Sequence, residues 1–355
     1  MKTPRGYEGR RIQQTGGSTF AVSLPKAWVR ANNLTRGALV YFLPREDGSL
    51  SVYTEEVPKL EKVRRVCLVT NKTPPDHIFR RLVSVYISGA PLVEVRTKER
   101  MDPSTREVVR KFVQQVIGPE ILEETPTGVV LQDMVSSNPM PLPSVLRRMH
   151  LMAREMQSDA MTGFRGQDAS IARDVADRDW EIDRLHWFVN KTVVMALKDP
   201  RLLPTLSITL PDCLTYDLAS KTLERIADHA VRISRVTTMV SDVRLPATQV
   251  EQLAKLSEEA LVFLDSAVET IFTGDIDKAN EVIDGVGKTL ISRGPELEQI
   301  FAKKGRVAVA LAYVLESLER TALYAADLAE IALNHAVNSE RPPPPSPEGS
   351  RFTEG

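Results

Sequence analysis

Two pairs of acidic side chains repeat at a spacing of four residues in the second half of the chain. Asp179 and Asp183 form one pair, and Glu224 and Asp228 form the other. Residues four apart lie one above the other on a helix face, so each pair stacks two carboxylates. Carboxylate groups bind hard cations, although acids at this spacing are also common on solvated helix faces. The spacing therefore leaves both a cation site and an ordinary charged surface open.

Other residue types that carry out chemistry are sparse. Cys67 and Cys213 are the only cysteines and form no CxxC pair, which argues against a disulfide framework and a thiolate zinc site. His186 and His229 lie near the acids and could add nitrogen ligands, but a single histidine near a helix seam is more often structural. No Ser, His and Asp arrangement or Cys and His arrangement is visible, so an enzyme is the least favoured class.

The charge of the chain is divided between its two ends. The net charge is −1, yet residues 1–45 carry eight Lys or Arg against one acid, whereas residues 140–340 carry 23 against 30. The first segment is thus +7 and the second −7. A basic segment favours binding to a polyanion such as nucleic acid, and an ordinary basic surface is the alternative.

Length and hydropathy set the broad class. A chain of 355 residues is longer than one core usually organises and predicts two or three domains. The longest apolar run, Val307 to Leu315, has nine residues, and a membrane-spanning helix needs roughly 20. The N-terminus shows no apolar signal-peptide segment. These features predict a cytoplasmic protein without membrane insertion.

The first 56 residues show strand signals around one short helix. The stretches "FAVSL", "ALVYFL" and "LSVY" are typical of strands, and "REDGS" predicts a hairpin turn with Gly48 at a positive φ. Pro25 suits the first turn of a helix that ends at Asn32 and Asn33. Four short strands and one helix bury little surface alone, which favours a partner chain.

The stretch "RRIQQTGGSTFAVSLPKAWVRANNLTRGALVYFLPREDGSLSV" resembles the swapped-hairpin DNA-binding domain of the AbrB/SpoVT family over residues 9 to 54. The resemblance implies that two chains interleave their hairpins into a homodimer that binds double-stranded DNA. The residues that it assigns to the DNA-binding face are Arg5, Arg10, Arg11, Lys26 and Arg30.

Residues 60–135 have a different pattern, in which strands alternate with helices. The stretches "VRRVCLV", "PLVEVRT", "EILEE" and "GVVLQDM" predict strands, and residues 76–87 and 103–117 predict helices. This alternation favours a small α/β connector domain of βαβ type. No motif indicates its function, and a structural spacer is preferred over a ligand-sensing layer.

Prolines 139, 141 and 143 mark a linker, after which the chain has helical periodicity for about 200 residues. Six helices are predicted, over residues 142–163, 168–197, 211–239, 246–273, 276–301 and 305–337. In the third, one apolar seam is expected to face the neighbouring helices. Its members are Ala219, Leu223, Ile226, Ala230, Ile233 and Thr237. The stretch "KTLERIADHAVRIS" in the third helix resembles "ESLERTALYAADLA" in the sixth, which indicates two three-helix repeats. Residues 339–355 form a Pro-rich tail expected to be disordered.

The tandem bundles, with "LERIADHA" in their third helix, resemble the PhoU family of phosphate-uptake regulators over residues 140–338. Members carry an E/DxxxD motif on two helices of each bundle that can hold iron or zinc. The resemblance therefore implies a metal ion, such as iron, zinc or magnesium, at Asp179, Asp183, Glu224 and Asp228.

The second repeat departs from this pattern. By the internal alignment, Leu323, Val286 and Leu290 replace three of the acids, and only Glu319 remains. The sequence therefore predicts at most one metal site in the chain.

The expected architecture is multidomain: a swapped-hairpin DNA-binding domain of strands and one helix at 1–56, an α/β connector domain at 60–135, and all-α tandem three-helix bundles at 140–338. The function predicted from both resemblances is that of a phosphate-responsive transcriptional regulator, not an enzyme. The alternative is a signalling adaptor that docks its helical body on a phosphate ABC transporter or a sensor kinase, with the basic domain serving only for dimerisation. Duplex-binding assays distinguish the two.

Overall fold

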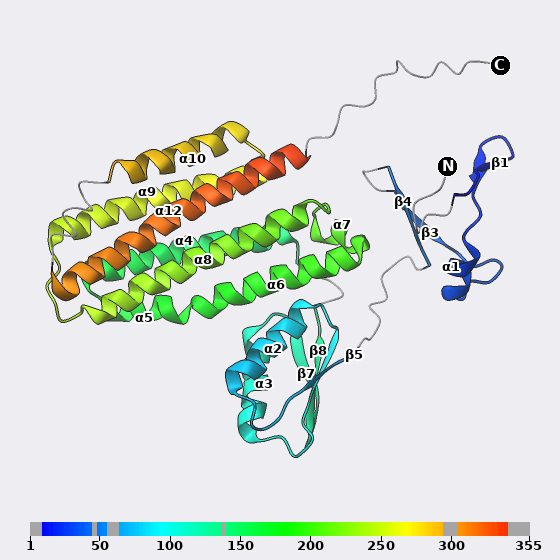
Figure 1. Ribbon diagram of the computed structural model, residues 1–355, viewed down its shortest axis with the longest axis horizontal. Helices are drawn as coiled ribbons and strands as arrows, with labels where there is room; N and C mark the ends of the chain where they lie inside the picture. Colours follow the sequence, from blue (N-terminus) through cyan, green and yellow to red (C-terminus); the bar gives the residue numbers. More distant parts are fainter. Residues whose placement is uncertain (1–8, 45–47, 55–63, 136–139, 294–303, 340–355) are drawn as a thin grey trace. The chain divides into compact units, whose positions relative to one another are not determined.

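The computed structural model describes the chain except residues 1–8, 45–47, 55–63, 136–139, 294–303 and 340–355 (Figure 1). Arg5, most of the "REDGS" turn and the Pro-rich tail therefore lie outside the described residues. The chain divides into two compact units, residues 1–59 and 60–355, and each is described by itself. No helix in the described ranges has the length and apolar character needed to cross a membrane.

The N-terminal unit, residues 1–59, consists of two hairpins and one helix. Strands β1 (Gln13–Thr15) and β2 (Thr19–Ala21) pair antiparallel, as do β3 (Tyr41–Pro44) and β4 (Leu50–Tyr53). Helix α1 (Lys26–Ala31) lies between the hairpins in sequence and ends at Asn32. Gly48 has a φ of +78°, a left-handed conformation that glycine adopts without strain. The prediction of four strands and one helix is confirmed.

This unit has no buried core among its described residues. Large apolar side chains are instead exposed on it: Ile12 by 71%, Phe20 by 69%, Leu39 by 72% and Leu50 by 55%. A two-stranded hairpin is only marginally stable in water by itself. The described residues of the N-terminal unit therefore leave its apolar side chains unburied.

Residues 64–133, called the α/β layer below, form a four-stranded sheet and two helices. In chain order they are β5 (Arg64–Leu68), α2 (Pro75–Ile87), β6 (Leu92–Arg96), α3 (Pro103–Gln115), β7 (Pro119–Thr125) and β8 (Gly128–Asp133). The strand order is β5-β6-β8-β7. Strands β5 and β6 are parallel and joined through α2, which is the βαβ arrangement that the sequence predicts. The helices and inward strand residues form one apolar core.

The helical bundle follows the α/β layer in the same compact unit. Its first repeat comprises α4 (Leu142–Gly166), α5 (Ala169–Asp177), α6 (Asp179–Lys198), a 3-10 turn (Pro200–Leu202), α7 (Leu203–Leu206) and α8 (Asp212–Met239). Its second repeat comprises α9 (Ala247–Thr273), α10 (Ile276–Ile291) and α12 (Gly305–Ser339). Figure 1 shows these long helices side by side, and one continuous apolar core joins the two repeats. All six predicted seam residues of α8 are fully buried.

The predicted helix over residues 168–197 is wrong in one respect, because it is two helices. Helix α5 begins after Asp168, whose carboxylate accepts hydrogen bonds from Ser170 N and Ile171 N. It ends at Arg178, and α6 begins at the next residue. The Arg178 guanidinium binds Asp159 of α4 and, at 3.0 Å, Asp174 of α5. The sequence there has no Gly or Pro, so the break depends on tertiary contacts that periodicity does not show.

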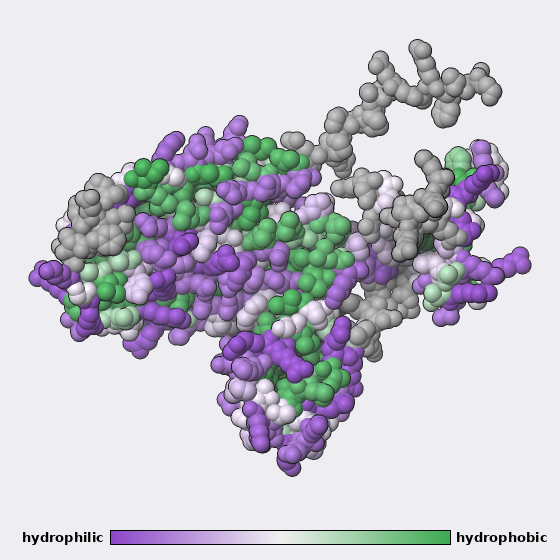
Figure 2. All heavy atoms as spheres, in the orientation of Figure 1, coloured by the Kyte–Doolittle hydropathy of each residue, from purple (hydrophilic) through white to green (hydrophobic). Residues whose placement is uncertain are grey.

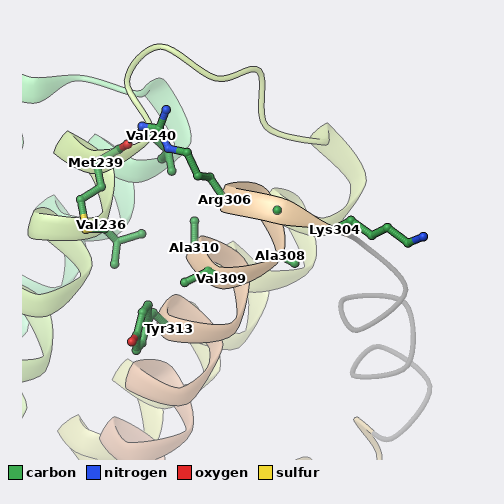
Figure 3. A pocket seen from close by; sticks show the side chains of 10 residues that line it. Val236, Met239, Val240, Lys304, Arg306, Ala308, Val309, Ala310 and Tyr313 are labelled. Atoms are coloured by element: carbon green, nitrogen blue, oxygen red, sulfur yellow. Dashed lines mark hydrogen bonds between the residues drawn. The ribbon is translucent and has the colours of Figure 1, made fainter.

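The surface of the second unit is mixed. Figure 2 shows hydrophilic side chains over most of the visible face, with hydrophobic side chains gathered in bands between them. A hollow of about 480 Å³ lies where the end of α8 meets the start of α12 (Figure 3). Its lining is mainly apolar, with Val236 and Val309 on opposite helices. The Arg306 guanidinium at its edge is already bound by Asp242, at 2.9 and 3.0 Å.

Candidate functional sites: an acid cluster on α6 and α8 and a basic helix

Helices α6 and α8 bring together the four acids that the sequence singles out, called the acid cluster below: Asp179, Asp183, Glu224 and Asp228. The first two lie on the first turns of α6, and the other two lie on the middle of α8, against which α6 packs. The pKa values of Asp179 and Asp183 on α6 are raised by the charge of Glu224 on α8, and the pKa of Asp228 on α8 is raised by the charge of Asp179. The two i, i+4 pairs therefore lie close enough to influence each other's charge, whereas the spacing predicts only the stacking within each pair.

Burial and mutual repulsion raise the affinity of this cluster for protons. Burial, followed by the charges of Asp179, Glu224 and Asp228, raises the pKa of Asp183 to about 7, although Lys221 opposes this rise. Burial, followed by the charge of Glu224, raises the pKa of Asp228 to about 6. Burial also raises the pKa of Asp179, while Arg235 opposes this rise. The cluster therefore holds protons at a pH where exposed carboxylates are ionised.

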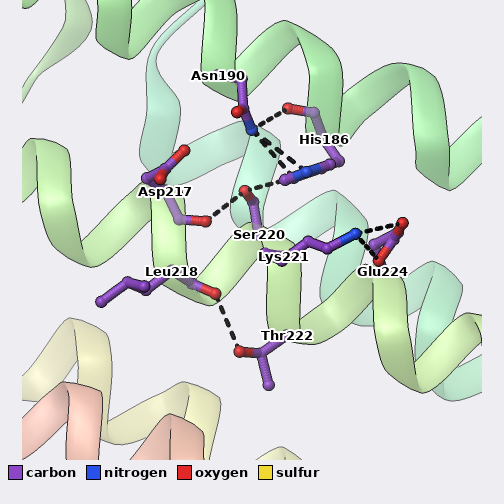
Figure 4. Close-up of polar contacts among 8 residues, drawn as sticks. All are labelled: His186, Asn190, Asp217, Leu218, Ser220, Lys221, Thr222 and Glu224. Carbon is purple, nitrogen blue, oxygen red and sulfur yellow. Dashed lines mark hydrogen bonds and ion pairs between the residues drawn. The ribbon is translucent and has the colours of Figure 1, made fainter.

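A lysine that sequence reasoning missed occupies one side of the acid cluster. Lys221 Nζ lies 2.8 Å from Glu224 Oε1 and 2.7 Å from Glu224 Oε2 (Figure 4). Asp179 Oδ1, in contrast, is buried and has no hydrogen-bond partner among the described residues. The i, i+3 spacing of Lys221 and Glu224 was the available sequence signal for the ion pair.

The side chains of the acid cluster are of a type that binds metal ions, but they are not arranged as a metal site. Carboxylate oxygens suit hard cations. Within the described ranges, however, no three His, Cys, Asp or Glu side chains lie in a group that could hold a metal ion. Glu224 is moreover bound by the Lys221 ammonium. The side chains as placed do not form a ligand set, and the metal assignment stays a prediction.

His186 is held in a hydrogen-bond network between α6 and α8 rather than directed at a metal. Its Nδ1 lies 2.9 Å from Ser220 Oγ, and the Ser220 hydroxyl donates to the Asp217 carbonyl at 2.9 Å (Figure 4). This pattern assigns the proton to Nδ1. Asn190 Nδ2 lies 3.3 Å from His186 Nε2. Burial, helped by Lys221, lowers the pKa of His186 to about 4, so the ring is neutral.

The other candidate side chains near the cluster do not add to it. Ser220 is fully buried, and its hydroxyl is engaged by the Asp217 carbonyl. The His229 ring lies 5.8 Å from the Tyr324 ring of α12, and burial lowers its pKa. In the second repeat Val286 is buried and Leu323 is 40% exposed. At these positions the second repeat offers no counterpart of the acid cluster.

The predicted DNA-binding residues fall on two elements of the N-terminal unit. Lys26 and Arg30 are exposed and lie one turn apart on α1, so they share a face of that helix. Arg10 and Arg11 are exposed and lead into β1. Helix α1 has no acid in its first turn. The structure thus places two of the five predicted residues on one helix face, and two on the segment before β1.

The chain is a multidomain protein. A small unit of strands and one helix is followed by the α/β layer and by two three-helix repeats. Comparison with known families agrees with the resemblances drawn from the sequence. Residues 146–237, within the first repeat, match the PhoU domain. Residues 13–57 match the family described as antidote-toxin recognition MazE, bacterial antitoxin. The chain therefore combines a PhoU domain with an N-terminal domain of MazE/AbrB type.

Individual relatives cover part of the chain. A phosphate-specific transport system accessory protein PhoU homolog from Zymomonas mobilis is 30% identical over 107 residues, which are 30% of this chain and 41% of that protein. This chain thus spans about two fifths of its curated relative. The crystal structure of PhoU from Pseudomonas aeruginosa has a TM-score of 0.48 at 19% identity, over 56% of this chain and 96% of that one. PhoU from Streptococcus pneumoniae has a TM-score of 0.47 at 18% identity, over 57% and 95%.

Proposed function

We propose that this protein is a phosphate-linked regulator that binds double-stranded DNA through its N-terminal unit. The observation that carries the proposal is the coincidence of a MazE-type domain with a +7 charge over residues 1–45. Lys and Arg that neutralise phosphates supply most of the sequence-independent affinity for DNA. Exposed Lys26 and Arg30 on α1 suit this role. The link to phosphate rests on the PhoU domain and on the name of the Zymomonas relative.

The DNA-binding form is proposed to be a homodimer. Ile12, Phe20 and Leu39 give the N-terminal unit an exposed apolar surface, and none of the residues described in this unit is buried. A second copy of the same unit would bury that surface and would double the positive charge presented to the duplex. The two +7 segments of the dimer would together carry a charge of +14, which anions in solution would partly neutralise.

The body is proposed to receive the phosphate-related signal at the acid cluster and to pass it to the DNA-binding unit. Buried carboxylates with a raised pKa are unusual on a purely structural helix face and are candidates for a functional site. Regulation of this kind requires two states that differ in DNA affinity. A regulatory role, rather than catalysis, agrees with the full burial of Ser220 and with the neutral, bonded His186.

The salt dependence of duplex binding tests this proposal. If the dimer neutralises about six phosphates, log K should fall with log salt at a slope of roughly −5. Lys26→Ala with Arg30→Ala removes four of the charges from a dimer, and we expect weaker binding and a shallower slope on specific and random duplexes alike. The matched control is Arg244→Ala with Lys255→Ala, two exposed cations of the bundle. Failure of the unmodified protein to bind any duplex at low salt contradicts the DNA-binding role.

That failure would favour the second candidate, an adaptor that docks its body on a phosphate transporter or sensor kinase. The observation in its favour is an apolar pair on α8, where Leu214 is 65% exposed and Leu218 is 44% exposed. The two residues lie one helical turn apart and present adjacent apolar side chains to solvent. For an adaptor, Leu214→Ser with Leu218→Ser should weaken capture of the purified partner, whereas Lys26→Ala with Arg30→Ala should leave capture unchanged.

A further inference from the structure

The four-stranded sheet of the α/β layer is covered by helices α2 and α3 on one face (Figure 1). Successive side chains of a strand point to opposite faces of a sheet. Cys67, Val95 and Leu131 point into the apolar core that the two helices complete. The opposite face of the sheet is called the open face below. The layer therefore has a packed face and an open face.

The packed side of the α/β layer joins it to the bundle along α6. The Trp187 ring lies edge-on to an aromatic ring of α2, with centroids 6.0 Å apart. At the end of α2, Gly89 approaches so closely that a Cβ would lie 2.6 Å from Met195 Cγ. Lys191 Nζ lies 2.8 Å from Asp133 Oδ2 at the end of β8, and the two side chains are only 1% and 4% exposed. These contacts use α2 and the end of β8, and they do not involve the open face.

Apolar side chains are exposed at both edges of the open face. Strands β5 and β7 are the edge strands of the sheet. On β5, Val66 is 45% exposed and Leu68 is 58% exposed, although Cys67 between them is buried. On β7, Leu122 lies in the β-bulge of that strand and is 60% exposed. Apolar side chains gathered on the edge strands of one sheet indicate an interaction surface.

The charges of the open face are divided between the same two edges. The Glu94 carboxylate accepts Arg64 Nε at 2.8 Å and an Arg96 terminal nitrogen at 2.6 Å, and both guanidinium groups stay half-exposed. Two cations and one anion leave a positive charge on the half of the face that contains β5. The half that contains β7 carries the exposed acids Glu120 and Glu123. One edge of the open face is therefore positive and the other negative.

The strand register places these side chains in rows that cross the sheet. Residues that are cross-strand partners share a face. The first row of the open face consists of Arg64, Leu92, Gln132 and Glu120. The second row consists of Val66, Glu94, Val130 and Glu123. Each row thus begins on the positive edge of the face and ends on the negative edge.

We propose that the open face docks on the open face of a second copy of this chain. A two-fold axis that runs parallel to the strands, between β6 and β8, places β5 of one copy over β7 of the other. Arg64 then lies opposite Glu120 of the second copy. Val66 and Leu68 of one copy lie against Leu122 of the other. Because the contact is two-fold symmetric, the positive edge meets the negative edge twice.

A two-fold axis that runs across the strands is disfavoured by the same charges. It would place β5 over β5 and β7 over β7. Glu120 and Glu123 of one copy would then face the same two acids of the second copy, and facing like charges are a strong penalty in an interface. The division of charge therefore selects one of the two ways in which the sheets can stack.

The size of the open face indicates how strongly it can hold a second copy. Four strands about 4.8 Å apart and about five residues long cover about 250 Å². Stable complexes bury about 800 Å² on each partner. The contact therefore needs a second attachment, and it rests on the homodimer proposed above for the N-terminal unit. Residues 54–63 join that unit to β5, and a short connection of this kind raises the effective concentration of the second sheet to about millimolar.

Cross-linking of the full chain tests the contact. Val66 and Glu123 end one row, so the axis parallel to the strands brings Val66 of one copy opposite Glu123 of the other, about 10 Å away across the packed sheets. We expect Val66→Cys with Glu123→Cys to give a covalent dimer with a bis-maleimide of that length. Either single variant should give at least about tenfold less, because like positions of the two copies lie about 17 Å apart. Cys67 and Cys213 are buried, and the unmodified protein gives the baseline.

Control variants separate this contact from chance collisions. Arg80→Cys with Lys111→Cys places two thiols at exposed positions of α2 and α3 and should give no covalent dimer above the baseline. Addition of Leu122→Lys to the reactive pair should reduce the yield to the baseline, because it places a charge in the apolar contact. Addition of Glu107→Lys, at an exposed position of α3, should leave the yield unchanged.

The outcomes distinguish this contact from the other proposals. A covalent dimer from Val66→Cys alone means that β5 faces β5 and overturns the arrangement. Equal yields from the reactive pair and the control pair, or no covalent dimer at all, contradict the contact. Light scattering measures the homodimer and the salt titration measures DNA binding. A dimeric protein that is not cross-linked therefore loses this contact and keeps the dimer of the N-terminal unit.

Discussion

The four carboxylates of the acid cluster could be identified from their spacing in the sequence, but their burial and their neighbours could not. Their i, i+4 spacing predicts two stacked pairs, and the structure places one pair on α6 and the other on α8, where their charges influence each other. The burial that raises their pKa follows from the packing of α6 on α8, which spacing does not reveal. The Lys191–Asp133 pair was missed altogether, since its members are 58 positions apart and lie in different predicted domains.

Because the pKa of Asp183 is raised in the folded chain, we expect Asp183→Asn to stabilise the protein at high pH. The folded pKa of about 7 exceeds the usual value of 3.8, so the folded chain binds the proton more tightly and loses stability as pH rises through this range. Asp183→Asn removes that loss. We expect the free energy of unfolding of this variant to be higher by about 1–3 kcal/mol at pH 8, since one pKa unit is worth about 1.4 kcal/mol. Denaturant unfolding at pH 8 and pH 4 measures it, and an equal gain at both pH values would contradict this account.

His186 should act in the opposite direction. Its folded pKa of about 4 is below the usual 6.5, so the unfolded chain binds the proton more readily and stability falls as pH decreases from 6.5 to 4. His186→Gln cannot take up that proton. The variant should be less stable at pH 8 by about 1 kcal/mol, because the bond to Ser220 is lost. By pH 4.5 the gap should close or reverse, because the unmodified protein has then lost about 2 kcal/mol through protonation of His186 in the unfolded chain. A constant difference across this range would show that His186 does not titrate on unfolding.

At the scale of elements, hydrophobic periodicity predicts the helices of the bundle because packing and periodicity agree there. The predicted third and fourth helices, residues 211–239 and 246–273, match α8 and α9 to within a residue at each end. The end of the predicted fifth helix falls on residues 294–303, outside the described residues. The break between α5 and α6 was missed because the ion pair of Arg178 with Asp159 of α4 is a tertiary contact with no local signal, while the i, i+4 pair of Arg178 with Asp174 is equally compatible with a continuous helix.

The junction of the α/β layer with α6 depends on a glycine that no sequence pattern marks. Gly118 has a φ of +105°, and a Cβ there would lie 2.3 Å from Asp133 Oδ1. Gly118→Ala should displace Asp133 from Lys191 and destabilise the chain by about 2 kcal/mol or more, through strain and the disturbed buried pair. Gly166→Ala is the control, because its Cβ would meet nothing within 4 Å and its φ is not positive. Chemical denaturation should rank Gly118→Ala well below Gly166→Ala, and equal stabilities would contradict the role of this close approach.

At the scale of the whole molecule, the multidomain fold class can be predicted because three segments of the sequence differ in their secondary-structure signals. Strand signals, βαβ alternation and helical periodicity follow one another along the chain, and each is confirmed in kind. The structure has two compact units, since the α/β layer packs on α6 within the second. This docking depends on Trp187, Lys191 and Met195, which belong to a predicted bundle helix and carry no sign of a second contact surface.

The assembly of the whole chain can be predicted from where apolar surface is buried. Residues 60–355 contain two apolar cores of their own, whereas no described residue of the N-terminal unit is buried. Phe20 and Leu39 are exposed, and we expect a second copy of the unit to cover them. Light scattering of the intact protein should therefore give twice the chain mass of 39.5 kDa.

Removal of residues 1–59 should leave a folded body that has lost this self-association. We expect the shortened chain to keep its helical circular dichroism, because both cores are complete without the N-terminal unit. Its mass by light scattering should be that of one chain, since the proposed dimer contact has been removed. The control is Phe20→Ser with Leu39→Ser in the full chain, which keeps every residue but makes the exposed patch polar, and it should weaken the dimer at micromolar concentration. If the intact protein is a monomer, or if the shortened chain stays a dimer, then the N-terminal unit does not hold the two copies together, and its exposed apolar side chains need another partner.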